Sequence, residues 1–142
     1  MAAINPYLNF NGNTDDAFNF YRSVFGGEFQ SLMRWSDNPD CAEWAEADKQ
    51  KLMHISLPIG SNVLMGTDTL EAMGQSVTPG TNFSITISPD SREEADRIFK
   101  KLSADGEVEM EMQDMFWGAY FGSFTDKFGI QWMINQEAGG AA

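Results

Sequence analysis

His54 is the one side chain of this chain that ordinarily titrates near neutral pH, because its 142 residues include a single histidine. An imidazole can take a proton from a ligand or return one, so His54 is the natural candidate for a general acid or base. No Ser-His-Asp or Cys-His spacing supports a catalytic triad. A lone histidine on a strand is more often structural, hydrogen-bonded to a neighbour, and both interpretations of His54 stay open here.

The same counts argue against a metal centre. A catalytic zinc, nickel or iron ion normally needs about three His, Glu, Asp or Cys side chains. The chain offers one histidine, and its one cysteine, Cys41, lies in an acidic stretch. We therefore expect no divalent metal ion and no other cofactor.

A second group of chemically useful residues emerges from strand alternation, which places successive residues on opposite faces of a sheet. In 82–88, Phe83, Ile85 and Ile87 are apolar and should face a helix, while the residues between them are small and polar. The residues expected on the face without helices are Tyr7, Asn9, His54, Ser56, Asn82, Ser84, Thr86, Gln131 and Met133, joined by Trp117, Phe121 and Ser123 through the correspondence of the two halves.

Hydroxyls, amides and aromatic rings around one hollow would orient a small ligand by hydrogen bonds and stacking. These residues are therefore predicted to be ligand-binding. The alternative is a solvated sheet face that binds nothing.

The elements that must position these residues are written twice in the sequence. Residues 14–28, TDDAFNFYRSVFGGE, recur in altered form at 92–107, REEADRIFKKLSADGE. Each copy follows a strand-like run and precedes further ones, and one helix cannot cover two separated sheets. The repeat predicts an α+β fold in which two βαβββ modules form a cupped eight-stranded mixed sheet. We expect one domain over 1–142, with module one at 4–68, a linker at 69–80 and module two at 81–137.

Local signals set the element boundaries. Asn13 is expected to cap the first helix, which Gly26-Gly27 ends, and Ser91 with Glu94 forms a capping box for the second. Alternation in 107–113 predicts Val108, Met110 and Met112 on one face. Strands are predicted at 7–10, 28–35, 52–57, 62–67, 82–88, 107–113, 117–125 and 130–135.

Residues 36–50, SDNPDCAEWAEADKQ, interrupt this pattern and have no counterpart of equal length in the second copy. They predict a long loop or a short surface helix. Trp44 within them either closes over a partner or a cleft, or packs onto its own domain.

The chain carries 21 acidic against 9 basic residues, a formal net charge of −12. Nucleic acid and anionic membranes bind clustered Lys and Arg, so neither is expected as a partner. The charge serves solubility, or it attracts a cationic ligand. No apolar run is long enough to span a bilayer, and no secretion signal is recognisable at the N-terminus. With its single cysteine, the chain is expected in the cytoplasm.

Three segments, PYLNFNGNTDDAFNFYRSVFGGEF, MHISLPIGSNVLMGTD and WGAYFGSFTDKFGIQWMIN, resemble the PhnB-like branch of the glyoxalase/bleomycin-resistance (vicinal oxygen chelate) superfamily. The resemblance covers nearly the whole chain and implies paired βαβββ modules and usually a homodimer. Some relatives carry a demethylubiquinone methyltransferase label, but no segment here looks like a glycine-rich adenosylmethionine loop. Metal-dependent members hold their ion at positions that fall here near Pro6, His54 or Ser56, Asn82 and Met133, and only His54 is a good ligand.

Three functions remain open at this stage. The first is a metal-independent small-molecule binding protein that traps a cationic or aromatic ligand, with Trp44, Trp117 and Tyr120 as candidate contacts. The second is a lyase or isomerase of glyoxalase type that acts on a small oxygenated metabolite through His54. The third is a structural dimer whose cleft is vestigial.

Overall fold

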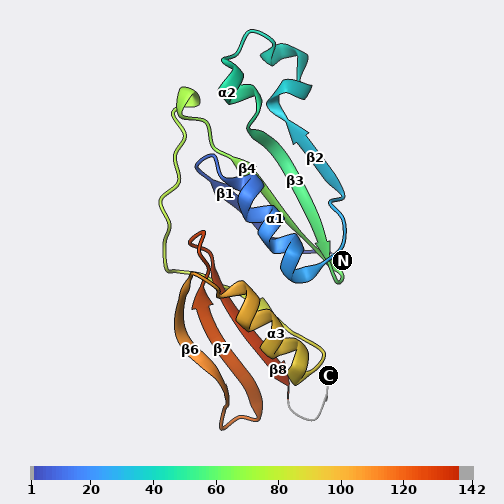
Figure 1. The fold of residues 1–142 in the computed structure, drawn as a ribbon, viewed down its shortest axis with the longest axis vertical. Helices are drawn as coiled ribbons and strands as arrows, with labels where there is room; N and C mark the ends of the chain where they lie inside the picture. The colour runs from blue at the N-terminus through green and yellow to red at the C-terminus, as the bar shows by residue number, and fades with distance from the viewer. Residues whose placement is uncertain (1, 138–142) are drawn as a thin grey trace. The chain divides into compact units, whose positions relative to one another are not determined.

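The computed structural model describes residues 2–137, which form two compact units that divide between Thr78 and Pro79. Each unit is a four-stranded sheet with one long helix on one of its faces (Figure 1). The predicted linker 69–80 contains the point of division. No helix within residues 2–137 is both long enough and apolar enough to cross a bilayer.

Unit 1 begins with the predicted β-α-β order. It contains β1 (Tyr7–Phe10), α1 (Thr14–Phe25), β2 (Ser31–Arg34), β3 (Leu52–Ile59) and β4 (Asn62–Asp68), and the short helices η1 (Trp35–Asp37), η2 (Pro39–Cys41), α2 (Glu46–Lys49) and η3 (Glu71–Met73). The strand order is β1-β4-β3-β2. β1 runs parallel to β4, and the other two pairs are antiparallel.

Unit 2 repeats this plan. It contains β5 (Ile85–Ile87), α3 (Arg92–Leu102), β6 (Glu107–Asp114), β7 (Ala119–Thr125) and β8 (Gln131–Glu137). Its order β5-β8-β7-β6 again has one parallel pair and two antiparallel pairs. The duplication and the eight mixed strands are therefore confirmed, and hydrogen bonds join the strands in two sets of four.

The core of each unit lies between its helix and one face of its sheet. In α1 the predicted stripe of Ala17, Tyr21 and Val24 is buried, together with Phe18. Full burial of one such large apolar side chain contributes about 1.5–3 kcal/mol. Gly66 on β4 lets α1 approach closely, because a Cβ there would lie 2.5 Å from the Phe18 ring.

The second helix also packs over a glycine of its sheet. The predicted stripe of α3 is buried, as shown by Ala95, Ile98, Phe99 and Leu102. A Cβ on Gly122 of β7 would lie 3.0 Å from the Phe99 ring. Each helix is thus seated over a position of its sheet that has no side chain.

The two helix starts differ from one another. Ser91 caps α3 as predicted, since its hydroxyl accepts the Glu94 N–H at 3.1 Å. Asn13 occupies the N-cap position of α1 as predicted, but its side chain makes no capping hydrogen bond. The N–H of Thr14 instead donates to the carboxylate of Asp68 at 3.0 Å, a residue 54 positions away in the chain.

Two predictions of alternation also failed. Phe83 was expected in the core but is 65% exposed, because β5 begins only at Ile85. In β6, two register shifts break the expected common face: Val108 pairs with Phe124, whereas Met110 pairs with Ser123. Bulges of this kind are frequent on edge strands, where they discourage pairing with other chains.

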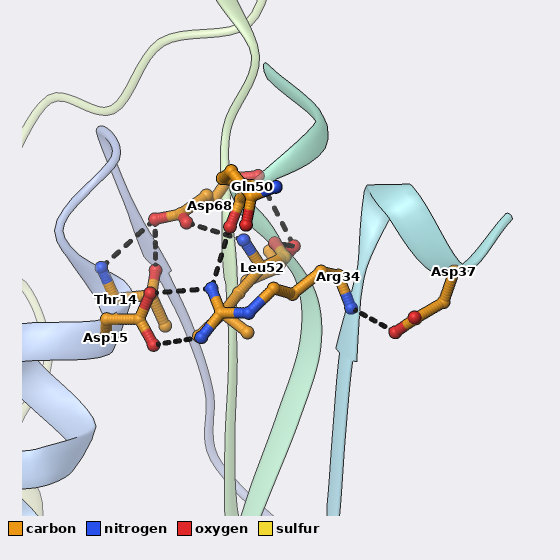
Figure 2. A network of polar contacts seen from close by, with 8 residues as sticks. Thr14, Asp15, Arg34, Asp37, Gln50, Leu52 and Asp68 are labelled. Atoms are coloured by element: carbon orange, nitrogen blue, oxygen red, sulfur yellow. Dashed lines mark hydrogen bonds and ion pairs between the residues drawn. The ribbon is translucent and has the colours of Figure 1, made fainter. Parts of the chain in front are cut away.

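Residues 36–50 form short helical turns, as predicted for a loop with surface helix. Arg34 holds the base of this segment (Figure 2): its guanidinium donates to Asp15 of α1 at 2.8 and 3.1 Å and to the Gln50 carbonyl at 2.7 Å. The Trp44 ring lies 5.1 Å, centroid to centroid, from that of Trp35. Trp44 therefore packs onto Trp35 of its own unit, which was one of the two alternatives.

Candidate functional site

The face of each sheet away from its helix is called its open face, and in unit 1 it carries four of the predicted residues. Leu8 and Phe10 are buried toward α1, so Tyr7 and Asn9 project to the other side of β1. By the same alternation, His54 and Ser56 of β3 lie on the open face.

Tyr7 and His54 contact one another on this face. The Tyr7 hydroxyl lies 3.1 Å from Nδ1 of His54, and the two ring centroids are 5.7 Å apart with a 38° tilt. Burial raises the pKa of the Tyr7 phenol, an effect that a hydrogen bond with Thr67 partly offsets. The phenol is therefore protonated across the neutral range and acts as a neutral hydroxyl toward the imidazole.

Three further residues of this face were not predicted. Ser31 shares a 2.8 Å hydrogen bond with the buried hydroxyl of Ser56. Met33 pairs with His54 across β2 and β3, and Thr67 pairs with Asn9 across β4 and β1. Alternation in 62–67 could have predicted that Thr67 lies on this face, but no pattern in the sequence indicates that β2 pairs with the strand that carries His54.

A buried polar network supports this part of unit 1 (Figure 2). Asp68, which is 3% exposed, accepts three hydrogen bonds: from Thr14 N at 3.0 Å, Thr14 Oγ1 at 2.6 Å and Leu52 N at 2.8 Å. These bonds tie the end of β4 to the start of α1 and the start of β3. Since Asp68 follows Thr67 directly, the network also fixes the backbone around Thr67.

In unit 2 the open face carries Thr86, Ser123, Gln131 and Met133. Ser123 pairs with Met133 across β7 and β8, and the Thr86 hydroxyl lies 3.9 Å from the Met133 sulfur. The Gln131 amide donates to the Phe83 carbonyl at 2.6 Å, so one of its donors is already occupied.

Phe121 also lies in β7, on the same face as Ser123, whereas the other predicted residues of unit 2 lie outside the strands. Asn82 and Ser84 precede β5 and are exposed, so alternation along a strand does not place them. Trp117 precedes β7, is 52% exposed and contacts Phe121 with ring centroids 6.2 Å apart. Phe116, which is 98% exposed, extends this aromatic group at 5.1 Å from Trp117.

Tyr120 is not available as an aromatic contact for a cationic ligand. The Arg92 guanidinium covers its ring at 3.8 Å from the centroid. Its hydroxyl donates to Asp96 of α3 at 2.5 Å, and this bond raises the pKa of the phenol. The Arg92 guanidinium therefore occupies the face of the Tyr120 ring that was expected to contact a cationic ligand.

The residues around His54 do not suit a catalytic metal of the kind the superfamily resemblance implies. Tyr7 and Thr67 offer hydroxyls there, and Met33 offers a thioether. Within residues 2–137, no three His, Cys, Asp or Glu side chains gather as they would around an ion. Cys41 is buried in η2, and burial raises the pKa of its thiol.

Known proteins resemble this chain over nearly its full length. The family model described as the Glyoxalase/Bleomycin resistance protein/Dioxygenase superfamily matches residues 3–134. Protein YjdN of Escherichia coli (strain K12) is 31% identical over 141 residues, 93% of each chain. The crystal structure of protein PA1353 from Pseudomonas aeruginosa is 39% identical, with a TM-score of 0.84, and the match covers 97% of this chain and 99% of that one. A Bacillus cereus structure, described as a putative 3-demethylubiquinone-9 3-methyltransferase, PhnB protein, is 26% identical with a TM-score of 0.75, covering 95% and 99%.

Proposed function

The chain belongs to the glyoxalase/bleomycin resistance protein/dioxygenase superfamily, in its PhnB-like branch, and from that premise we propose that it binds a small molecule without a catalytic metal ion. The observation that carries the proposal is the Tyr7–His54 pair on the open face of unit 1, surrounded by hydroxyls and thioethers rather than by a set of metal ligands. Such groups orient a ligand by hydrogen bonds and contacts.

The proposed ligand is cationic or aromatic. The excess of 12 negative charges attracts cations to the protein. The rings of Tyr7 and His54, whose centroids are 5.7 Å apart, offer faces to an aromatic or ammonium group. The same charge favours neither nucleic acid nor an anionic membrane as a partner, and the proposal includes a homodimer of this chain, which light scattering tests directly.

The experiment is a thermal-shift screen on chelator-treated protein, with matched sets of cationic, neutral and anionic aromatic compounds. A ligand at 100 times its Kd stabilises the protein by about 2.7 kcal/mol. We expect cationic aromatics to raise Tm, and His54→Ala to reduce that gain. Met73→Leu on η3 is the matched control, because Met73 is exposed and lies outside both open faces. If only the metal-loaded protein binds, or if no compound of any class stabilises it, the proposal is wrong.

The Tyr7–His54 contact also favours a second candidate, an enzyme of glyoxalase type in which His54 moves a proton of a small oxygenated metabolite. Elemental analysis of the purified protein, followed by His54→Ala in an assay against such metabolites, separates the two. Turnover by a metal-free protein that His54→Ala abolishes would support the enzyme. Activity unaffected by that substitution would eliminate it.

A further inference from the structure

The side chain of Asn11 fastens the end of unit 1 to the turn between β1 and α1. Its Nδ2 donates to Val77 O at 3.1 Å, and its Oδ1 accepts from Val77 N at 2.9 Å. A backbone N–H can only donate and a carbonyl oxygen can only accept, so the two partners fix which end of the carboxamide is oxygen and which is nitrogen. We call this pair of hydrogen bonds the Asn11 clamp.

A second segment of unit 1 also binds this carboxamide. The Thr69 hydroxyl lies 3.0 Å from Oδ1 of Asn11, and Thr69 N donates to Phe10 O at 2.8 Å. Thr69 directly follows β4, whereas Val77 lies beyond η3. The Asn11 side chain therefore joins three parts of the chain: the end of β1, the end of β4 and the segment that follows η3.

The clamp lies where the chain leaves unit 1. Residues 75–80 belong to no helix or strand, and unit 1 ends at Thr78. Among residues 2–137, the hydrogen bonds that join residues 76–78 to the rest of unit 1 are the two with Asn11. Without the clamp, residues 76–78 would become part of the free segment that connects the two units.

Asn11 is also the one asparagine of the chain that a glycine follows, and both residues are exposed. This dipeptide favours deamidation, because glycine has no side chain to hinder its own backbone nitrogen. Gly12 N attacks Cγ of Asn11 and closes a succinimide ring, the bond from Cγ to Nδ2 breaks, and ammonia leaves with the proton of the Gly12 nitrogen. Water then opens the ring and leaves an aspartate or an isoaspartate.

We propose that Asn11 is a deamidation site that irreversibly controls how residues 76–78 are attached to unit 1. While the clamp is closed, both ends of the carboxamide are bound, and its rotation toward Gly12 N is restrained. After deamidation the side chain has no N–H to donate, so an oxygen faces Val77 O, acceptor against acceptor. The clamp can open and close before the reaction but cannot re-form after it. This inference does not depend on the proposed ligand.

The rate of deamidation tests the restraint. Peptide mass spectrometry follows the reaction of Asn11 in the folded protein and in the same protein unfolded in guanidinium chloride. We expect the folded protein to react at least about fivefold more slowly, the effect of one hydrogen bond. Thr69→Val removes a donor to Oδ1 and should accelerate the reaction of the folded protein, whereas Thr69→Ser should not. Equal rates in the folded and unfolded protein, or a folded Thr69→Val protein that reacts no faster, would overturn the proposal.

Hydrogen exchange tests the consequence of the reaction. Asn11→Asp supplies the carboxylate from the start and should speed exchange of the Val77 N–H by about fivefold or more. Asn13→Asp is the matched control: it makes the same change of charge in the same exposed turn, at a side chain that makes no capping bond, and should leave Val77 unchanged. A Val77 N–H that exchanges equally fast in Asn11→Asp and in the wild type would show that the clamp survives the carboxylate, and the proposal would be wrong.

Discussion

Replacing Asp68 with asparagine should strongly destabilise the protein, although the two side chains have nearly the same shape. The Asp68 carboxylate is almost fully buried and accepts three hydrogen bonds, two of them from Thr14 on one oxygen and one from Leu52 N on the other. An asparagine can keep its oxygen toward Thr14, but its NH2 group then faces the Leu52 N–H, donor against donor. The perturbation is therefore nearly isosteric and purely electrostatic.

The magnitude follows from the bonds affected. Loss of one charge-assisted bond and of the partner for a buried N–H costs about 1.5–3 kcal/mol. The two bonds from Thr14 become neutral and lose about 0.5–1 kcal/mol each. We therefore expect Asp68→Asn to lower the free energy of unfolding by about 3 kcal/mol, a large share of the roughly 5–15 kcal/mol that stabilises a typical protein.

Urea unfolding followed by tryptophan fluorescence measures this change, and a calorimetric Tm should fall by about 10 °C. Glu43→Gln is the matched control, because Glu43 is exposed in the 36–50 segment and should change stability by no more than about 0.5 kcal/mol. If Asp68→Asn changes the free energy of unfolding by less than 1 kcal/mol, the hydrogen-bond argument is refuted.

Three further outcomes are expected. Gly66→Ala should lose about 1–3 kcal/mol in urea unfolding, because its Cβ would lie 2.5 Å from a phenyl ring of α1; an unchanged midpoint would contradict that close approach. Arg34→Met should cost only about 0.5–1 kcal/mol, since its pair with Asp15 is partly exposed and screened, yet it should speed amide exchange throughout 36–50 in a hydrogen-exchange experiment. The raised pKa of Tyr7 contributes stability that is complete below pH 10, the ordinary phenol value, and is lost as the pH rises through the folded-state pKa; Tyr7→Phe should remove this part of the alkaline fall in a denaturation series.

The sequence predicted the helices well because their signals are local. Ala95, Ile98, Phe99 and Leu102 recur at helical spacing, and all four are buried. Ser91 caps its helix through a neighbour three residues away. By contrast, the side chain that accepts a hydrogen bond from the first N–H group of α1 is that of Asp68, far along the chain. No local sequence pattern indicates that Asp68, rather than Asn13, makes this bond.

The sequence could predict on which face of the sheet the candidate site residues lie, but not which of them contact one another. Alternation correctly places Tyr7 and His54 away from α1. That they meet depends on β4 lying between β1 and β3 and on the registers of both pairs, which a single sequence does not specify. Phe83 shows the opposite error, since the alternation in the sequence starts before Ile85, the residue at which β5 begins.

The segment 36–50 leaves and rejoins the sheet at one point, where Trp35 N donates to Lys51 O at 3.1 Å and Arg34 clamps the base. Lengthening a loop whose two ends are held together in this way costs only about 0.6 kcal/mol for each doubling of its length. The segment should therefore tolerate insertions: an epitope tag or a reporter peptide inserted near Glu43 should leave the sheet and the Tyr7–His54 pair undisturbed.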